Sequence, residues 1–348
     1  MRYEDMFIAA AASRLPARVA VADAVADGSF EESTARRTGL ESVSVAAGEP
    51  PAAMAAAAAR AALDASGHDG GEIDLILYAD VYYQGQDLWA PASYVQRVAV
   101  GNRCPAIEIR QMSNGGMAAL ELAANHLGGS GGTAALLTTG DRFDPPGFDR
   151  WRSDPGTVYA DGGTAVVLSR RGGFAALRSL ATVSEPELEG MHRGTDPFGS
   201  APFSHRPRVD LAAHKQNFLA GHGLSRSVDQ INSGHDETLK RALADADCSL
   251  ADIDLFVLPH LGLSRLGHLY LRRWGVDQAA TTWSWSRTVG HLGAGDQYAA
   301  LAHLVESGAL RPGQRCLLAG VGAGFTWSIA VLEIIATPPR PADAVATG

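Results

Sequence analysis

The chain reads RAALDASGHDGGEIDLILYAD at residues 60–80 and RALADADCSLADIDLFVLPHL at residues 241–261, two stretches that share one pattern. In each, an Ala- and Leu-rich segment with helical spacing leads through a polar turn into an Ile-Asp-Leu run that opens an apolar segment. This change of spacing predicts a helix followed by a short buried strand in both places. The shared pattern is the first sign that the fold contains a repeated unit.

Three more pairs of similar segments follow in the same order along the chain. They are SNGGMAALELAANHL (113–127) with HLGAGDQYAALAHL (291–304), GGTAALLTTGD (131–141) with GQRCLLAGVGAG (313–324), and TAVVLS (164–169) with IAVLEI (329–334). A single match could arise by chance, but four pairs in register at roughly constant separation indicate duplication of a β/α unit.

The duplication predicts the domain organisation. Short apolar strands that alternate with longer helices are typical of an α/β fold with mixed or parallel sheets covered by helices. We expect two halves, residues 1–171 and 172–336, that pack face to face. Residues 183–235, with their Pro, Gly and His content, are predicted to be an insertion at the start of the second half. Residues 337–348 are predicted to be a disordered tail.

The composition excludes several classes of protein. The 348 residues are 46 % apolar and 19 % charged, a balance typical of a soluble globular protein with a sizeable core. The net charge of −9 argues against a general nucleic-acid surface. No apolar run reaches the ~18 residues of a membrane span, and the first residues, MRYEDMFIAAAA, carry acids where a signal peptide needs basic residues. We therefore expect a cytoplasmic protein.

The cysteines predict neither a disulfide framework nor a metal site. Cys104, Cys248 and Cys316 are an odd number without metal-ligand spacing, so no metal is expected. They are interpreted as a residue before a strand, a residue at a helix end and a buried strand residue, none of which suggests a reactive thiolate. A cysteine nucleophile is therefore not expected.

A serine stands where a helix is predicted to begin. In RQMSNGGMAAL (110–120), Ser113 separates a strand-like run from an alanine-rich helix. If the halves pack face to face, the helix starts at Ser113 and His291 meet near a pseudo-twofold axis, where helix dipoles and free amides favour negative charge. Ser113 could then be a nucleophile, or it could simply cap its helix.

Two histidines and an aspartate could activate that serine. His260 directly follows the predicted strand IDLFVLP, and His291 precedes Asp296 by five residues in the glycine-rich turn GHLGAGD. A serine hydroxyl needs a base to take its proton, and the base works best when a carboxylate fixes its tautomer. The alternative is that both histidines are structural and that Asp296 only balances a helix dipole.

A glycine-rich turn offers a second candidate element. Residues 320–327, GVGAGFTW, separate two predicted strands, and their glycines would allow backbone amides to approach a substrate closely. The N–H of Ala323 is a candidate oxyanion donor. The alternative is a simple β-turn between paired strands.

Several of these motifs resemble one known family. TGLES (38–42), AARAALDASGHDGGEIDLILYADV (58–81), APASYVQRVAVG (90–101), DGGTAVVLS (161–169), LPHLGLSRLG (258–267), VGHLGAGD (289–296) and GVGAGFTWSIAVLEI (320–334) carry the resemblance. Over residues 1–335 the chain resembles the 3-oxoacyl-acyl-carrier-protein synthase III branch of the thiolase superfamily. The resemblance implies a thiolase fold, with duplicated βαβαβαββ halves in a five-layer αβαβα arrangement.

The resemblance also assigns site residues. In the family a cysteine occupies the position of Ser113, a histidine that of His260 and an asparagine that of His291, so two of three catalytic positions differ here. The oxyanion amides would be those of Ser113 and Ala323. A subgroup of polyketide-associated relatives looks similar, with a serine nucleophile and a GHLGAGD motif, and its pattern adds His192 in EGMHRG.

The resemblance implies a thioester as substrate and a second copy of the chain as partner. We expect no permanently bound cofactor, but acyl-coenzyme A or an acyl carrier protein as substrate. Trp151 and Arg152 fall where relatives hold the nucleotide of coenzyme A, unless they belong to a solvated loop. A homodimer is expected, with residues 75–83 (LILYADVYY) at its interface. Candidates for a basic patch that meets a carrier protein are Arg206, Arg208, Lys215, Arg272 and Arg273.

Together, the candidate residues and the resemblance predict an acyltransferase that works through an acyl-Ser113 intermediate. His291, oriented by Asp296, would be the base, and His260 would position or protonate the leaving thiol. The acceptor would be a hydroxyl, an amine or another carrier protein in a polyketide or other natural-product pathway. One alternative is a priming ketosynthase that condenses a starter unit with a malonyl thioester, and another is a non-catalytic partner subunit. The sequence leaves the acyl chain and the acceptor open.

Overall fold

Nine strands form one mixed β-sheet in the computed structural model, which describes residues 1–338. The order across the sheet is β5-β4-β6-β7-β1-β8-β11-β10-β9, and two short strands, β2 and β3, form a separate ribbon. The strand bounds are β1 Phe7–Arg14, β2 Arg18–Ala20, β3 Ser42–Ser44, β4 Ile73–Ala79, β5 Ala106–Ile109, β6 Ala134–Asp141, β7 Gly162–Ser169, β8 Ala175–Ser184, β9 Leu255–Val257, β10 Arg315–Gly322 and β11 Thr326–Ile334.

The strand order repeats, as the duplicated sequence predicts. In the first half β4 is parallel to β6, β6 is antiparallel to β7, and β7 is antiparallel to β1. In the second half β9 is parallel to β10, β10 is antiparallel to β11, and β11 is antiparallel to β8. The halves join where β1 pairs with β8 through Phe7 with Ala176 and Ile8 with Ala175. The predicted boundary at residue 171 lies in the connection between β7 and β8.

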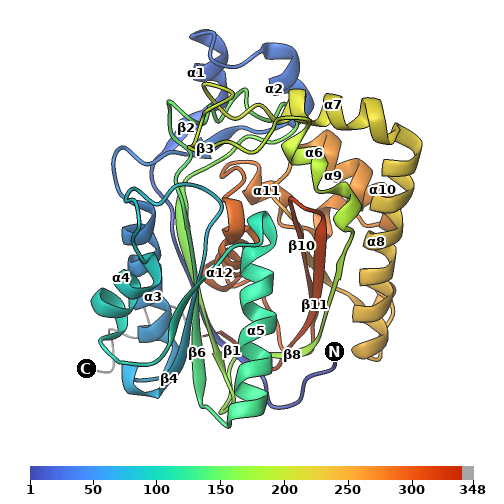
Figure 1. The fold of residues 1–348 in the computed structure, drawn as a ribbon. Helices are drawn as coiled ribbons and strands as arrows, with labels where there is room; N and C mark the ends of the chain where they lie inside the picture. The colour runs from blue at the N-terminus through green and yellow to red at the C-terminus, as the bar shows by residue number, and fades with distance from the viewer. Residues whose placement is uncertain (339–348) are drawn as a thin grey trace.

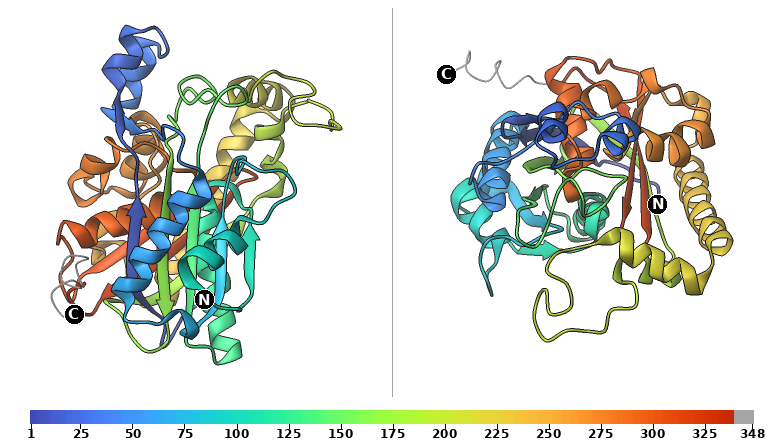
Figure 2. Two further views of the ribbon diagram at one scale, coloured as in Figure 1. Left: turned by 90° about the vertical axis from the view of Figure 1, so that its left-hand side faces the viewer. Right: turned by 90° about the horizontal axis from the view of Figure 1, so that it is seen from above.

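Helices cover both faces of the sheet and fill the space between the halves. In Figure 1, α3 lies outside the first half, α8 lies outside the second, and α5 and α12 lie between them. Figure 2 shows the same layers from the side and from above. The α/β thiolase fold with five layers is therefore confirmed. The main helices are α3 Pro51–Ser66, α5 Gly115–Ser130, α8 Leu224–Asp245 and α12 Asp296–Glu306.

The remaining helical segments are mostly short, with α7 the longest of them. They are α1 Val21–Ala26, α2 Glu32–Thr38, η1 Gly70–Glu72, α4 Pro91–Val95, η2 Gln96–Val100, η3 Met112–Asn114, η4 Pro186–Leu188, α6 Gly190–Arg193, α7 Leu211–His222, η5 Leu250–Asp252, α9 Leu263–Leu266, η6 Gly267–Leu271, α10 Arg272–Trp274, η7 Gln278–Ala280, α11 Trp283–Ser286 and η8 Gly293–Gly295.

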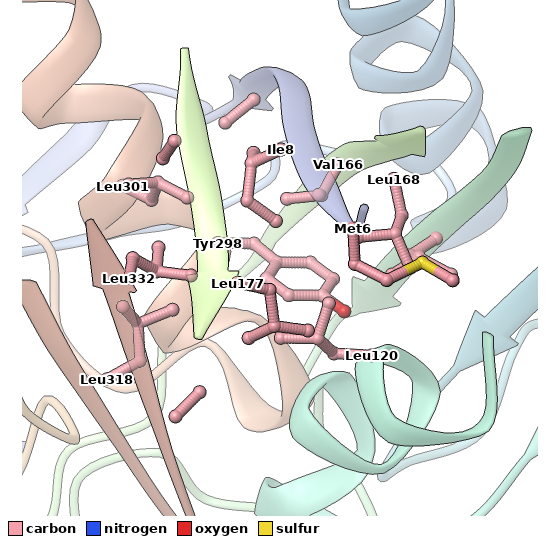
Figure 3. Packing of buried hydrophobic residues seen from close by; sticks show 14 of the residues in the cluster. Met6, Ile8, Leu120, Val166, Leu168, Leu177, Tyr298, Leu301, Leu318 and Leu332 are labelled. Carbon is pink, nitrogen blue, oxygen red and sulfur yellow. The ribbon is translucent and has the colours of Figure 1, made fainter. Parts of the chain in front are cut away.

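The core between the halves is built by residues that the repeat places on inward faces. Figure 3 shows Leu120 of α5 and Tyr298 of α12 packed against strand residues such as Val166, Leu177 and Leu332. All are almost fully buried. Alanines and glycines elsewhere on α5 let the helix come close to the sheet, which gives dense packing and removes apolar surface from water.

Two predicted segments can be located in the structure. The region predicted as an insertion, residues 183–235, contains α6, α7 and the first part of α8, which begins at Leu224. Residues 75–83, predicted to lie at a dimer interface, include most of β4, which pairs with β5 on one side and β6 on the other. The homodimer itself stays a prediction. Most of the predicted tail, residues 339–348, lies outside the described residues.

No helix within residues 1–338 is both long enough and apolar enough to pass through a bilayer.

Candidate active site

The structure brings the starts of α5 and α12 into direct contact. A Cβ atom on Gly116 would lie 2.6 Å from the carbonyl oxygen of Ala294, and one on Gly115 would lie 3.1 Å from the Cβ of Ala294. The hydroxyl of Tyr298 donates a hydrogen bond of 2.6 Å to the carbonyl of Gly116 and ties the two helices together. Glycine is thus required at both positions of α5, since only a backbone without side chains allows this approach.

Ser113, His291 and Asp296 form a hydrogen-bonded relay at this contact. Oγ of Ser113 lies 2.8 Å from Nε2 of His291, and Nδ1 of His291 lies 2.6 Å from Oδ2 of Asp296. Because a carboxylate only accepts, Nδ1 carries the proton and Nε2 is left to accept from the hydroxyl. This is the arrangement in which an imidazole can remove a proton from a serine.

The carboxylate of Asp296 is deeply buried and held ionised. Burial alone would raise its pKa, but electrostatic interaction with the imidazoles of His260 and His291, with hydrogen bonds from both residues, lowers the pKa of Asp296 to about 2. The amide of Leu292 donates to Oδ1 at 2.8 Å, and the amide of His260 donates to Oδ2 at 2.8 Å. Three hydrogen bonds, from the His291 ring and from the amides of Leu292 and His260, therefore fix the one acid that orients His291.

His260 also contacts the carboxylate of Asp296. Its Nδ1 lies 3.0 Å from the carbonyl oxygen of Gly290 and 3.4 Å from Oδ1 of Asp296, while Nε2 has no protein partner. Its neighbours Pro259 and Leu261 line the cavity at Ser113. The ring edge that carries Nδ1 thus points toward Asp296, and His291 is the histidine that meets Ser113 directly. Contact of His260 with a leaving thiol stays a prediction.

Burial also affects the charge of His260. Burial lowers the pKa of this imidazole more than the nearby Asp296 raises it. A neutral ring that donates Nδ1–H to the Gly290 carbonyl has only a lone pair at Nε2. In this state His260 holds Asp296 in place and is not a ready proton donor.

The turn before Ser113 is strained and closely packed. Met112 has φ +50°, in the left-handed region that side chains other than glycine rarely adopt. A Cβ atom on Gly320 of β10 would lie 2.5 Å from the side-chain oxygen of Asn114, and one on Gly322 would clash with the Gln111 carbonyl. The glycines of β10 therefore let the hairpin reach the serine turn.

That hairpin carries the predicted oxyanion donor. Ala323 lies between β10 and β11, and its turn is closed by the Phe325 amide, which donates 2.9 Å to the Gly322 carbonyl. Ala323 and Gly322 line the same cavity as Ser113. The structure thus places the two predicted amide donors on facing turns.

His192 lies on the wall of the same cavity. It belongs to α6, its ring is 5.5 Å from that of Phe325, and its Nδ1 has no protein partner. Burial lowers the pKa of His192 to about 4, against a smaller opposing effect of Asp154. The ring is therefore neutral near neutral pH.

The cavity has a volume of about 740 Å³, which suits an organic substrate. One wall is aromatic, formed by Tyr82, Phe143, Phe148 and Tyr159, whose rings contact one another at centroid distances of 4.7–5.8 Å. Tyr159 also presents its ring to His291 at 4.9 Å. An apolar acyl group next to Ser113 would lose its contact with water here.

Sequence reasoning missed a buried ion pair in the cavity. The two terminal nitrogens of the Arg265 guanidinium donate to the carboxylate of Asp154, at 2.8 and 2.9 Å. Nη1 of Arg265 also donates to Oγ1 of Thr157. Arg265, Asp154 and Lys215 line the cavity. Arg265 follows His260 by five residues in LPHLGLSRLG. This closeness to the strand end is the one sequence feature that could have pointed to Arg265 as a cavity residue.

Trp151 and Arg152 do not reach the cavity. The Trp151 ring packs on Phe30 at 5.2 Å, and the Arg152 guanidinium donates 2.6 Å to the carbonyl of Gly28. Both residues therefore contact the connection between α1 and α2. A contact of either with a nucleotide stays a prediction.

Most of the arginines predicted for a carrier-protein patch are already paired within the chain. Arg206 binds Asp196 at 2.5 Å, Arg208 lies 3.3 Å from Asp149, Arg273 binds Asp236, and Arg272 contacts His268. Lys215 faces the cavity instead, and burial lowers the pKa of its amine.

No cysteine among residues 1–338 lines the cavity. Burial raises the pKa of all three thiols, to about 12 for Cys316. Within the same part of the chain, no cluster of three or more His, Cys, Asp or Glu residues could hold a metal ion. Ser113 is thus the nucleophile candidate at this site, with Nε2 of His291 beside its hydroxyl.

Comparison with known proteins shows close similarity along nearly the whole chain. Residues 243–334 match the family described as 3-oxoacyl-[acyl-carrier-protein (ACP)] synthase III C terminal. A β-ketoacyl-[acyl-carrier-protein] synthase III of Neisseria meningitidis is 28 % identical over 333 residues, covering 94 % of this chain and 98 % of the relative.

Two solved structures extend this similarity to three dimensions. ChlB3, described as an acyltransferase, is 35 % identical with a TM-score of 0.91, and the match covers 96 % of this chain and 99 % of that one. The priming β-ketosynthase of the R1128 polyketide pathway is 21 % identical with a TM-score of 0.78, covering 96 % and 97 %. At that identity the second structure supports the fold alone.

Proposed function

The chain belongs to the thiolase superfamily as a 3-oxoacyl-[acyl-carrier-protein] synthase III-like member, and from this premise we propose that it is an acyltransferase acting through an acyl-Ser113 intermediate. The observation that carries the proposal is the relay in which Nε2 of His291 lies 2.8 Å from Oγ of Ser113 and Nδ1 lies 2.6 Å from Asp296. Relatives named β-ketoacyl-[acyl-carrier-protein] synthase III support a thioester donor, either acyl-coenzyme A or an acyl carrier protein.

In the first half-reaction, Ser113 attacks the carbonyl carbon of the thioester while Nε2 of His291 takes the hydroxyl proton. The new C–O bond forms a tetrahedral intermediate, whose negative oxygen would accept hydrogen bonds from the amides of Ser113 and Ala323. The C–S bond then breaks, and the imidazolium of His291 returns its proton to the departing thiolate. The products are an acyl-Ser113 ester and a free thiol.

In the second half-reaction, the acceptor attacks the ester carbonyl and gives its proton to His291. The C–O bond to Ser113 breaks, and the imidazolium protonates the serine oxygen. An oxoester is less activated than a thioester, so transfer to a thiol is uphill, whereas transfer to a hydroxyl or amine is not. A hydroxyl or amine of a natural-product intermediate is therefore the favoured acceptor, with a carrier-protein thiol as a further one.

Serine and the relay fit each other chemically. A cysteine can ionise with help from a helix dipole, whereas a serine hydroxyl has a much higher pKa and needs a positioned base. The presence of His291 with a buried, ionised Asp296 behind it supplies that base. A non-catalytic subunit would not need this matched set, which argues against that alternative.

A second candidate is starter-unit condensation with a malonyl thioester. It is favoured by relatives that carry the name β-ketoacyl-[acyl-carrier-protein] synthase III. In that reaction the acceptor is a carbanion formed by loss of carbon dioxide, and its enolate oxygen needs hydrogen-bond donors. The neutral state of His260, with no proton at Nε2, makes this residue a poor donor for that oxygen.

Intact-mass spectrometry tests the proposal. The protein is mixed with acyl-coenzyme A and, separately, with an acyl carrier protein, and we expect a mass increase equal to the acyl group. The increase must vanish in Ser113→Ala, and an adduct that survives there would reject the intermediate. Addition of malonyl-coenzyme A then separates the candidates, because condensation releases carbon dioxide and transfer to a hydroxyl or amine does not.

A further inference from the structure

A second buried histidine faces the cavity without any protein partner. His235 lies on α8 and is 4 % exposed, and neither ring nitrogen makes a hydrogen bond within residues 1–338. It nevertheless lines the same cavity as Ser113, together with Ile231, Leu269 and Tyr270. None of the steps written for acyl transfer uses it.

The surroundings hold this ring in one place and in one charge state. The His235 ring stacks on Trp274 at 4.9 Å and meets Tyr270 edge to face at 4.8 Å. Burial lowers the pKa of His235 to about 4, and the charge of Arg273 lowers it further. Near neutral pH the ring is therefore neutral, with one nitrogen that donates and one that accepts.

The backbone brings this ring to the wall of the cavity. The residue before it, Gly234, has no room for a Cβ atom, because such an atom would clash with the ring of Trp327 on β11. Trp327 also lines the cavity. The close approach of α8 to β11, visible at the right of Figure 1, thus brings His235 to the cavity wall. The part of the cavity that α8 and η6 line is called the arm between α8 and η6, and its apolar lining residues are Ile231, Leu269 and Tyr270.

An imidazole in such a place has an energetic cost unless something pairs with it. A buried polar group without a hydrogen bond loses its hydration and gains nothing in return. A leucine or phenylalanine would fill the same aromatic niche without that cost. The helix wall opposite His235 includes η6, a π-helical turn, and such turns occur often at functional sites.

We propose that His235 recognises an alcohol hydroxyl on the substrate that occupies the arm between α8 and η6. A hydroxyl both donates and accepts, so it pairs with either nitrogen of a neutral imidazole. A charged group fits less well, because the arm is lined by Ile231, Leu269 and Tyr270 and would strip it of water. His235 is thus a specificity residue for the acyl transfer proposed above, on which this inference rests.

The hydroxyl could come from the acyl donor or from the acceptor, and the two half-reactions distinguish these sources. The donor arm compares the rate of Ser113 acylation by octanoyl N-acetylcysteamine thioester with the rates for monohydroxyoctanoyl thioesters, one for each hydroxyl position. The acceptor arm starts from acetyl-Ser113 protein and compares octanol with a series of octanediols. In one arm, at one hydroxyl position, we expect the hydroxylated probe to react about tenfold faster or more.

His235→Phe keeps the stack on Trp274 and removes both nitrogens, so this preference should fall to about one. His235→Gln, which keeps one donor and one acceptor, should restore part of it. The matched control is His222→Phe on α7, where a histidine also stacks on an aromatic ring, that of Phe218 at 4.6 Å, but does not line the cavity. His222→Phe should keep the full preference.

A binding measurement separates this inference from the proposed function. Calorimetry with Ser113→Ala protein needs no turnover, and the hydroxylated probe should bind about tenfold more tightly than its plain counterpart. If no probe acylates Ser113 but this difference is seen and is lost in the added His235→Phe, the inference stands and acyl transfer fails. If octanoyl-Ser113 forms but no hydroxyl position matters in either arm or in binding, the inference is overturned and acyl transfer stands.

Discussion

Gly116 faces the carbonyl oxygen of Ala294 so closely that an added Cβ atom would lie 2.6 Å from it. This contact joins the helix that follows Ser113 to the turn that follows His291. The spacing between Ser113 and His291, which lie 178 residues apart in the chain, therefore depends on Gly116 carrying a hydrogen atom in place of a methyl group.

Gly116→Ala should accordingly weaken both the fold and the site. The methyl group must push α5 away from Ala294, and such overpacking costs about 1–3 kcal/mol. We expect a lower melting temperature and slower acylation of Ser113. Gly129→Ala is the matched control, because Gly129 lies on the same helix with no atom within 4 Å of its built Cβ. That variant should gain up to about 1 kcal/mol from improved helix propensity, with acylation unchanged.

Asp296→Asn should slow acylation without removing the serine. The amide can no longer hold the proton on Nδ1 of His291 by charge, so Nε2 is less often free to accept from Ser113. By analogy with other serine relays, the rate of acylation should fall by about 10³-fold or more. Donor binding to Ser113→Ala protein should change little when Asp296→Asn is added. The exposed Asp229→Asn is the control, and an equal loss there would contradict the positioning role.

Alkylation should distinguish this site from a cysteine-dependent one. Burial raises the pKa of Cys104, Cys248 and Cys316, and none of them lines the cavity. Treatment with iodoacetamide near neutral pH should therefore leave acylation intact. Ser113→Cys places a thiol at the position where Oγ lies 2.8 Å from Nε2 of His291, and this variant should become sensitive to the reagent. Rapid inactivation of the wild type would reject the assignment of Ser113.

His192 should make the protein less stable in mild acid. Its pKa is lowered to about 4 in the folded chain by burial, whereas about 6.5 is expected when the chain is unfolded. The unfolded chain thus binds the extra proton between these values, so the free energy of unfolding falls as the pH drops from about 6.5 to about 4. This one group accounts for a loss of roughly 3 kcal/mol at most.

His192→Leu should remove that part of the pH dependence. Urea unfolding across this range gives the slope for wild type and variant. The comparison near pH 8 is the internal control, because His192 is then neutral in both folded and unfolded chains. Equal slopes between pH 6.5 and 4 would show that the ring is not held neutral.

Much of this molecule followed from local sequence patterns. The matching stretches that end at β4 and β9 revealed the duplication, and duplication made Ser113 and His291 equivalent positions at two helix starts. The sequence also predicted Asp296 as a site residue, because it lies five residues beyond His291 in a glycine-rich turn, and Ala323, because glycines flank it. These conclusions depend on helix and strand periodicity, which neighbouring residues determine.

Tertiary packing decided the rest. The contact of His260 with Asp296 depends on the side of the strand end that its ring occupies, and the sequence does not specify that side. The pair Asp154 with Arg265, and the cavity wall at His235, join segments that are distant in the chain. Their meeting is set by how helices fill the space beside the second half of the sheet. Periodicity specifies a residue's place on its own element, but the environment of a side chain depends on the elements packed against it.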